Sequence, residues 1–153
     1  MSFTDYLVQE KDLVNLVSSG REFYGEEFNS TKLTYNYSYS LPNVLDSTAT
    51  FRLSVAANSQ LLSTFVAKIN NTTIGSLSVQ SMANAPVYEH AKTAITSPAF
   101  YFDPIPTNQL NVSLTYSNAN GQAWLNFFEL NVKRLLKLTN DVPLFFRNVD
   151  SLN

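Results

Sequence analysis

The chain has 153 residues, enough for one domain with a sizeable buried core. Only 14% of the residues are charged and the formal net charge is -2, so the chain lacks the cationic surface that nucleic-acid binding requires. Cysteine is absent, which excludes disulfides, a thiol nucleophile and thiolate metal sites within these residues. Eleven Phe, eight Tyr and one Trp, beside many Ser, Thr and Asn residues, favour β-strands over helices.

Residues 1–30 are interpreted as a lead-in segment, and the pattern there leaves the secondary structure open. Asp12–Val17 fits one or two helical turns or an irregular strand equally well. The first 25 residues show no basic run followed by an apolar core, and no stretch of about eighteen apolar residues occurs anywhere. We therefore expect neither a signal peptide nor a transmembrane span here, and the export signal of an exported parent would lie elsewhere.

Residues 19–28 (SGREFYGEEF) combine opposite charges, three aromatic rings and two glycines without a regular period, which indicates an ordered loop. Gly20 and Gly25 allow positive backbone φ or close backbone approach. The rings can pin the loop to a core; they are Phe23, Tyr24 and Phe28.

Arg21 is the one cation of this loop, and its guanidinium can form a forked pair with a carboxylate. We expect a structural ion pair with Glu26 or Glu129. A role of Arg21 in docking a neighbouring domain is the sharper and less favoured alternative.

From Leu33 onward, apolar residues alternate with period two between clusters of Asn, Ser and Pro, which is typical of antiparallel sandwiches. The segment 97–108 carries three prolines and is predicted to be a long ordered loop. The predicted inward stripes are Leu33, Tyr35, Tyr37 and Tyr39; Phe51, Leu53, Val55 and Ala57; Phe65, Ala67 and Ile69; and Leu110, Val112, Leu114 and Tyr116.

The turn at Asn118–Gly121 predicts a hairpin into a long last strand, residues 123–138. Phe128, Leu130 and Val132 would face the core. The opposite face carries Leu125, Phe127 and Glu129, so we expect that face to meet a second surface and to supply a partner for the carboxylate.

These elements predict an all-β, antiparallel, jelly-roll-like β-sandwich over residues 31–138, similar to the galactose-binding-like fold. Residues 139–153 would form an edge strand, at Asp141–Arg147, and a linker toward a downstream domain.

Three blocks of sequence resemble one known family. Residues 19–28 are similar to the signature Ser/Thr-Gly-Arg-x-Trp/Tyr-Tyr-Gly-Glu-x-Phe, found upstream of the peptidase domain in PorU-type sortases of the type IX secretion system, which are relatives of the gingipain cysteine proteases. Phe23 stands where that family usually has Trp. Residues 124–134 (WLNFFELNVKR) resemble a later segment of the family, and Phe146-Arg147 agrees too. The blocks occur in the family's order, and the sequence between them is generic.

This resemblance implies a non-catalytic accessory domain that precedes the peptidase domain of a cell-surface sortase. The parent would be a gingipain-like cysteine endopeptidase at the outer membrane, which cleaves the C-terminal sorting domain from secreted cargo and helps to attach that cargo to the surface. Here the domain would position cargo or brace the peptidase domain, which makes cargo sorting domains and the downstream peptidase its implied partners. The alternatives are a carbohydrate-binding module and a structural spacer.

Candidate catalytic and metal-binding groups are few. Gingipain-like peptidases use a Cys and His pair, whereas Cys is absent here and His90 is the only histidine. Glu26 and Glu27 are adjacent and point apart on an extended segment, so they do not form an acid and base pair. We predict no catalytic residue and no cofactor. A structural calcium held by Asp103, Asp46 and Asn side chains is less favoured, because no Asp-x-Asp-x-Asp-Gly loop occurs.

The tyrosine row of residues 35, 37 and 39 has two interpretations. It packs into the core or a domain interface, which we favour, or it forms a stacking platform for a sugar, with Tyr101 of the Pro-rich segment as a second contact. The candidate interface residues are Arg21, Phe23, Tyr24, Glu26, Tyr35, Tyr37, Tyr39, Tyr101 and Glu129.

Overall fold

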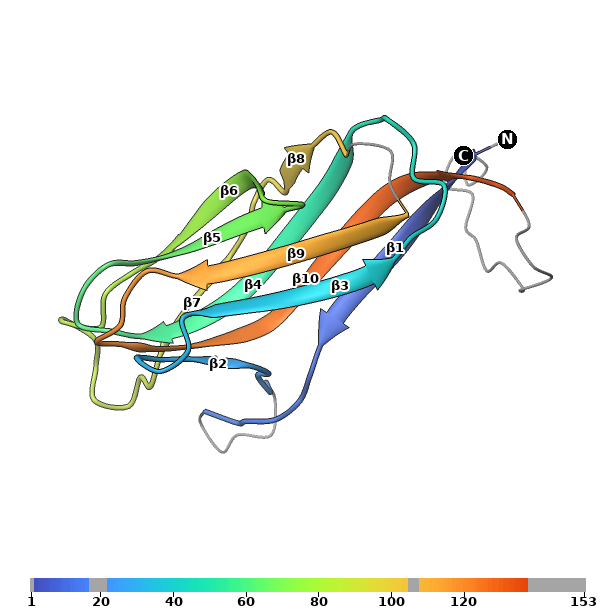
Figure 1. Ribbon diagram of the computed structural model, residues 1–153. Helices are drawn as coiled ribbons and strands as arrows, with labels where there is room; N and C mark the ends of the chain where they lie inside the picture. The colour runs from blue at the N-terminus through green and yellow to red at the C-terminus, as the bar shows by residue number, and fades with distance from the viewer. Residues whose placement is uncertain (1, 17–21, 105–107, 138–153) are drawn as a thin grey trace.

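A computed structural model describes residues 2–16, 22–104 and 108–137 (Figure 1). These residues form strands and connecting turns, so no helix among them is long and apolar enough to cross a membrane. The strands are β1 (Ser2–Glu10), β2 (Glu27–Phe28), β3 (Thr34–Ser40), β4 (Ala49–Asn58), β5 (Ser63–Ile69), β6 (Thr72–Val79), β7 (Lys92–Ile95), β8 (Phe100–Phe102), β9 (Gln109–Tyr116) and β10 (Gln122–Leu135).

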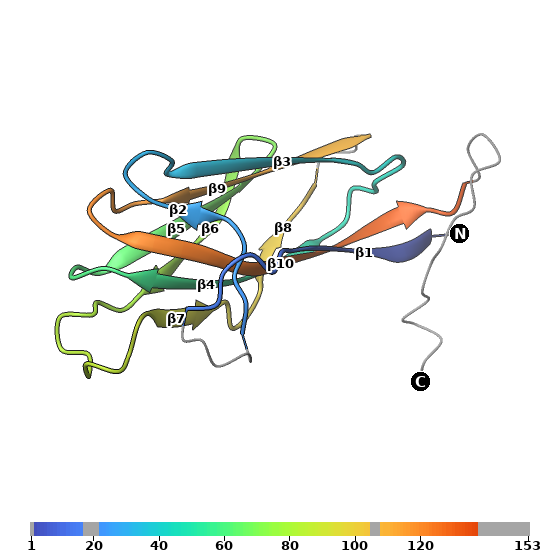
Figure 2. The same ribbon diagram turned by 90° about the horizontal axis from the view of Figure 1, so that it is seen from below.

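The strands form two antiparallel sheets that face each other as two layers (Figure 2). The larger sheet has the order β1-β10-β4-β7, with β2 pairing β10 and β8 pairing β4, and the smaller sheet has the order β3-β9-β5-β6. The predicted all-β, antiparallel, jelly-roll-like sandwich is therefore confirmed.

The core lies between the sheets and is rich in aromatic rings. The inward residues of β4, β5, β9 and β10 are buried because each strand presents alternate side chains to the opposite layer. The rings of Phe28 and Phe65 pack edge-on with their centroids 5.1 Å apart, and Phe128 stacks on Phe51 at 5.3 Å. Full burial of such a side chain contributes about 1.5–3 kcal/mol to folding.

A β-bulge in β10 changes which side chains face inward. The register between β10 and β4 shifts between Leu125 and Phe127, so Leu125 is buried in the main core while Phe127 stays on the outer face. The strict alternation expected from the sequence placed both side chains on one face, and the extra residue, Asn126, is the reason that this expectation is wrong.

The N-terminal residues belong to the larger sheet. Strand β1 pairs with β10 along its whole length, from Ser2 opposite Leu135 to Glu10 opposite Phe127. Strand β2 pairs with β10 at Ala123 and Trp124. The sandwich therefore includes strands from residues 1–30. The sequence did not indicate β1 because this strand lies at an edge of the sheet and its apolar alternation is weak. The edge strand expected at Asp141–Arg147 lies outside the described residues.

The connection after β9 is not a hairpin, contrary to the expectation from the turn sequence. Strand β9 lies between β3 and β5 in the smaller sheet, and β10 lies between β1 and β4 in the larger one. The turn therefore crosses from one layer to the other. Gly121 fits this crossing because a Cβ at its position would lie 2.7 Å from the Tyr116 hydroxyl. Alternation shows which face of a strand is buried, but it does not show which strand is its neighbour.

Arg134 joins three parts of the fold near the end of β10. Its side chain is only 11% exposed, its Nε donates a hydrogen bond to the carbonyl of Pro42 at 2.8 Å, and its Nη1 pairs with the carboxylate of Asp5. The guanidinium thereby ties β1 and the segment between β3 and β4 to β10.

Candidate interaction surfaces

The loop signature is anchored by Tyr24. This side chain is 4% exposed and packs with Ala56 and Trp124 in a small cluster on the outer side of the larger sheet. Its hydroxyl donates to the Glu22 carboxylate at 2.9 Å, and its backbone pairs with Val14. Burial, followed by the Glu22 carboxylate, raises the pKa of Tyr24 to about 12. The loop is therefore held against the sheet at this point.

The other predicted loop contacts divide into three groups. Phe28 is fully buried in the main core, whereas Phe23 is 41% exposed and does not pin the loop. Gly25 permits the close approach expected of it, since a Cβ there would lie 3.1 Å from the carbonyl oxygen of Lys11. Gly20 and Arg21 lie outside the described residues.

Glu26 is buried and forms an ion pair within the domain. The residue is 7% exposed, and its Oε1 pairs with Lys11 Nζ at 2.7 Å. Glu27 instead accepts hydrogen bonds from Asn29 and Gln122. The two adjacent carboxylates therefore have separate partners, and neither arrangement supplies an acid and base pair.

The tyrosine row of β3 packs inward and joins the two sheets. The rings of Tyr35 and Tyr37 pack edge-on against Phe28 and Phe128 respectively, at 4.9 and 5.1 Å between centroids. Tyr35 donates its hydroxyl hydrogen to the Glu27 carbonyl and Tyr39 donates to Gln9 Oε1, both at 2.9 Å. These rings therefore fill the side of the sandwich next to β3 instead of forming an open platform.

The pKa values of the same tyrosines reflect their position. Burial, and then the negative charge of Glu26, raises the pKa of Tyr39 to about 12. The same two causes raise the pKa of Tyr37 further above its ordinary range. All three phenols of the row are therefore neutral at physiological pH. Only Tyr35 and Tyr39 make the hydroxyl hydrogen bonds given above, because the buried Tyr37 hydroxyl has no partner among the described residues.

The outer face of the larger sheet carries most of the remaining candidates. The strand registers place Val8, Glu129 and Arg52 in one row across β1, β10 and β4. The next row, at the neighbouring alternate positions, runs through Tyr6, Asn131, Thr50 and Tyr101, and the row on the other side runs through Glu10, Phe127, Ser54 and Ile95. We call these three rows the outer face.

This outer face combines exposed apolar groups with a central ion pair. Arg52 Nη1 lies 3.7 Å from Glu129 Oε2, and burial followed by the Glu129 carboxylate raises the pKa of the adjacent Tyr6. Glu129 is thus paired with Arg52 of the neighbouring strand β4, whereas the sequence led us to expect Arg21 or a second surface to supply its partner. The exposed apolar members are Tyr6 at 52%, Val8 at 41%, Ile95 at 43% and Tyr101 at 63%. All four side chains lie on the same face of the larger sheet.

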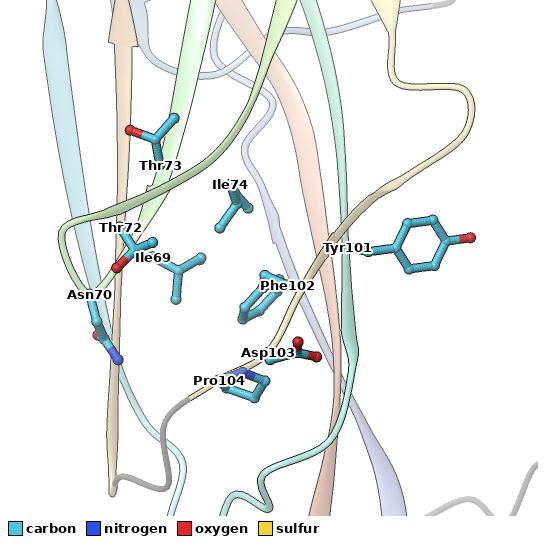
Figure 3. Close-up of a pocket in the computed structure, with 9 residues that line it drawn as sticks. All are labelled: Ile69, Asn70, Thr72, Thr73, Ile74, Tyr101, Phe102, Asp103 and Pro104. Atoms are coloured by element: carbon cyan, nitrogen blue, oxygen red, sulfur yellow. The ribbon is translucent and has the colours of Figure 1, made fainter.

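A pocket of about 430 Å³ lies between the two sheets, where the turn between β5 and β6 faces β8 (Figure 3). Ile69, Ile74 and Phe102 point into it, whereas the Tyr101 ring points to the opposite side of its strand (Figure 3). Asp103 lies at the rim and accepts a hydrogen bond from the Thr48 hydroxyl at 2.9 Å. Tyr101 therefore belongs to the outer face rather than to the centre of this pocket.

The candidate catalytic and metal-binding residues His90 and Asp46 lie at exposed positions in separate segments. His90 is exposed in the segment before β7, and Asp46 is exposed between β3 and β4. Within residues 2–16, 22–104 and 108–137, no group of three or more His, Cys, Asp or Glu side chains comes close enough to hold a metal ion. Asp46 and Asp103 are therefore not members of a cluster of three or more such side chains in these residues.

Sequence reasoning missed several surface residues that the fold assembles. Tyr6, Val8 and Arg52 come from two strands that meet Glu129 only through the β1-β10-β4 order, which no local pattern predicts. Phe102 was overlooked because three prolines favoured a loop where β8 forms. The period-two spacing of Tyr6 and Val8 was the available signal, but it lay in the segment interpreted as a lead-in.

The fold defines this chain as a two-sheet antiparallel β-sandwich domain. No family model matches the chain, and no curated protein matches it. Among solved structures, it is similar to dimeric latent PorU from Porphyromonas gingivalis, with a TM-score of 0.82 and 20% identity over 99% of this chain and 14% of that one. The resemblance to PorU-type sortases is thus confirmed at the level of fold, and the chain spans 14% of the PorU chain.

Two carbohydrate-binding modules are similar at a lower level. The CBM36-1 domain of a xylanase from the hindgut metagenome of Trinervitermes trinervoides has a TM-score of 0.49 and 11% identity over 82% of this chain and 96% of that one. A CBM36 module in complex with calcium and xylotriose has a TM-score of 0.48 and 14% identity over 82% and 98%. We draw no conclusion about ligands from likenesses of this level.

Proposed function

We propose that this chain is a non-catalytic accessory domain of a PorU-type protein and that it docks onto another domain of that protein. The observation that carries the proposal is the similarity of fold to PorU over 99% of the chain, together with the small share of PorU, 14%, that the match covers. A domain of this kind works through its surfaces, because the chain has no thiol for cysteine-peptidase chemistry.

The proposed docking surface is the outer face of the larger sheet. Its exposed apolar side chains surround the Arg52 and Glu129 pair, which resembles the apolar and polar mixture of interfaces between domains of one chain. The proposed partner is a gingipain-like cysteine peptidase domain, which the chain would brace while cargo sorting domains are cleaved. The proposed location is extracytoplasmic, at the outer membrane surface.

The proposal can be tested by calorimetric titration of the chain with the peptidase domain of its parent protein. We expect Tyr101→Arg to weaken association about tenfold or more, because it places a long cation within the apolar part of the docking surface. The matched control is Tyr88→Arg, since Tyr88 is 81% exposed and lies outside the outer face. Absence of association for the unmodified chain, or equal effects of the two variants, would contradict the proposal.

A further inference from the structure

The pocket next to β8 exists because the two sheets do not close completely at this side. Strand β6 is an edge of the smaller sheet, and β8 is attached to the larger sheet through β4. Farther along β6 the gap is filled, since the Phe100 ring lies so close to Gly75 that a Cβ there would approach it to 2.6 Å. Near the turn after β5 the ring of Phe102 lines the gap without filling it, and a cavity of about 430 Å³ remains. This volume lies within the range of about 300–1,000 Å³ for small-ligand sites.

The walls of this pocket are apolar inside and hydrogen-bonding at the rim. Ile69, Ile74 and the Phe102 ring point inward, as Figure 3 shows. The lining residues with an amide, hydroxyl or carboxylate group at the edge of this apolar wall are Asn70, Thr72, Thr73 and Asp103, and we call them the rim. A wholly apolar ligand would desolvate these rim groups without replacing their hydrogen bonds, so the walls favour a ligand with one apolar face and several hydroxyl or amide groups.

Two rim side chains are already oriented by the protein. Asn70 adopts a positive φ of 46° in the turn, and its Oδ1 accepts a hydrogen bond from the Asn111 N–H at 2.9 Å, which leaves its Nδ2 to donate. Asp103 Oδ1 accepts from Thr48, which leaves Oδ2 to accept. The rim therefore offers a fixed donor and a fixed charged acceptor before any ligand arrives.

The charge of the pocket restricts the ligand further. Asp103 is the one carboxylic acid among the described residues that line the pocket, and none of these residues is Lys or Arg. A phosphate, sulfate or carboxylate group would therefore meet a negative charge without a compensating cation. A neutral polyol suits the site, because its hydroxyl groups can donate to the carboxylate in charge-assisted hydrogen bonds.

We propose that this pocket binds an uncharged sugar. One face of a pyranose ring packs its C–H groups against Phe102 and Ile74, while ring hydroxyls donate to Asp103 and accept from Asn70. The pocket and the outer face share only Tyr101, whose ring points away from the pocket (Figure 3). The proposal therefore does not depend on the docking role described above.

The test is a nuclear magnetic resonance titration of the chain, isotopically labelled at Ile methyl and backbone amide groups. The probes are the methyl pyranosides of glucose, galactose, mannose and N-acetylglucosamine, and the neutral trisaccharides maltotriose, cellotriose and xylotriose. We expect at least one of them to give saturable shifts at Ile69, Ile74 and Phe102, with a Kd of about 1 mM or lower. Methyl glucuronide should bind at least about tenfold more weakly than the matching methyl glucoside.

Asp103→Asn is the decisive variant, since the amide can keep the bond from Thr48 but loses the charge. We expect it to weaken sugar binding about tenfold and to reduce the difference between glucoside and glucuronide. Asp46→Asn, at an exposed carboxylate between β3 and β4, is the control and should leave both affinities unchanged. The proposal is overturned if no probe shifts the pocket signals up to about 20 mM, if the uronide binds as well as the glucoside, or if Asp103→Asn and Asp46→Asn behave alike.

Discussion

Phe128→Ala is the most informative single substitution for the packing of the two sheets. Phe128 is fully buried on β10 and contacts rings from both layers. It stacks on Phe51 of β4 at 5.3 Å, and it meets Tyr37 and Tyr39 of β3 edge-on at 5.1 and 6.3 Å between ring centroids. Removal of the ring therefore takes away apolar burial and leaves a cavity at the point where β10, β4 and β3 meet.

We expect Phe128→Ala to lower the free energy of unfolding by about 3–5 kcal/mol. For a domain of this size, the melting temperature should fall by about 10 °C. The free energy is measured by urea unfolding with linear extrapolation, and the slope should stay unchanged if the native fold is retained.

Phe23→Ala is the matched control, because that ring is 41% exposed, and it should change the free energy by less than about 0.5 kcal/mol. A double-mutant cycle of Phe128→Ala with Tyr37→Leu should give a coupling energy of about 0.5–1.5 kcal/mol, because the two rings touch across the sandwich. A loss below about 1 kcal/mol for Phe128→Ala, or no coupling with Tyr37, would refute this account of the interior.

Three further predictions concern other parts of the fold. Gly75→Ala places a Cβ 2.6 Å from the Phe100 ring, so calorimetric unfolding should show a loss of about 1–3 kcal/mol. The pKa of Tyr24 rises on folding from 10.0 to about 12, so the folded state holds the phenol proton more tightly than the unfolded state does. The resulting stabilisation is complete below pH 10.0 and is lost as pH rises through about 12. Urea unfolding followed against pH should therefore show a smaller loss of stability over this window in Tyr24→Phe than in the unmodified chain. Arg134→Gln leaves the Asp5 carboxylate without its cation and should cost about 2–3 kcal/mol in urea unfolding, with the loss reduced when Asp5→Asn is combined with it.

The sequence predicted burial better than it predicted neighbours. The stripe from Leu110 to Tyr116 and the stripe from Phe51 to Ala57 are buried as expected, because hydrophobic alternation directly reports which face of a strand meets the core. The same alternation carries no information about sheet order. The turn before β10 was therefore taken for a hairpin, although it connects two layers.

The partners of the candidate surface residues could not be predicted either, because they depend on which strands are neighbours. Glu129 was singled out as a carboxylate in need of a partner, but its partner Arg52 comes from β4, which lies far away in the sequence. Because of the bulge at Asn126, Leu125 points to the opposite side of the sheet from the one expected. No residue type in this segment predicts such an insertion. The tyrosine row packs inward, which is the interpretation that the sequence favoured. The hydrogen-bond partners of its hydroxyls, in Gln9 and β2, could not be predicted because both lie in a segment whose structure the sequence left open.

The central claim is that the outer face of the larger sheet is the side that docks onto a peptidase domain, and lysine cross-linking of that complex tests it most directly. Lys133 is exposed on the outward side of β10, next to the outer face, and Lys68 is exposed on the outward side of β5 in the smaller sheet. We expect cross-links to the peptidase domain from Lys133 and none from Lys68. Cross-links from Lys68 without any from Lys133 would contradict the assignment of the docking surface.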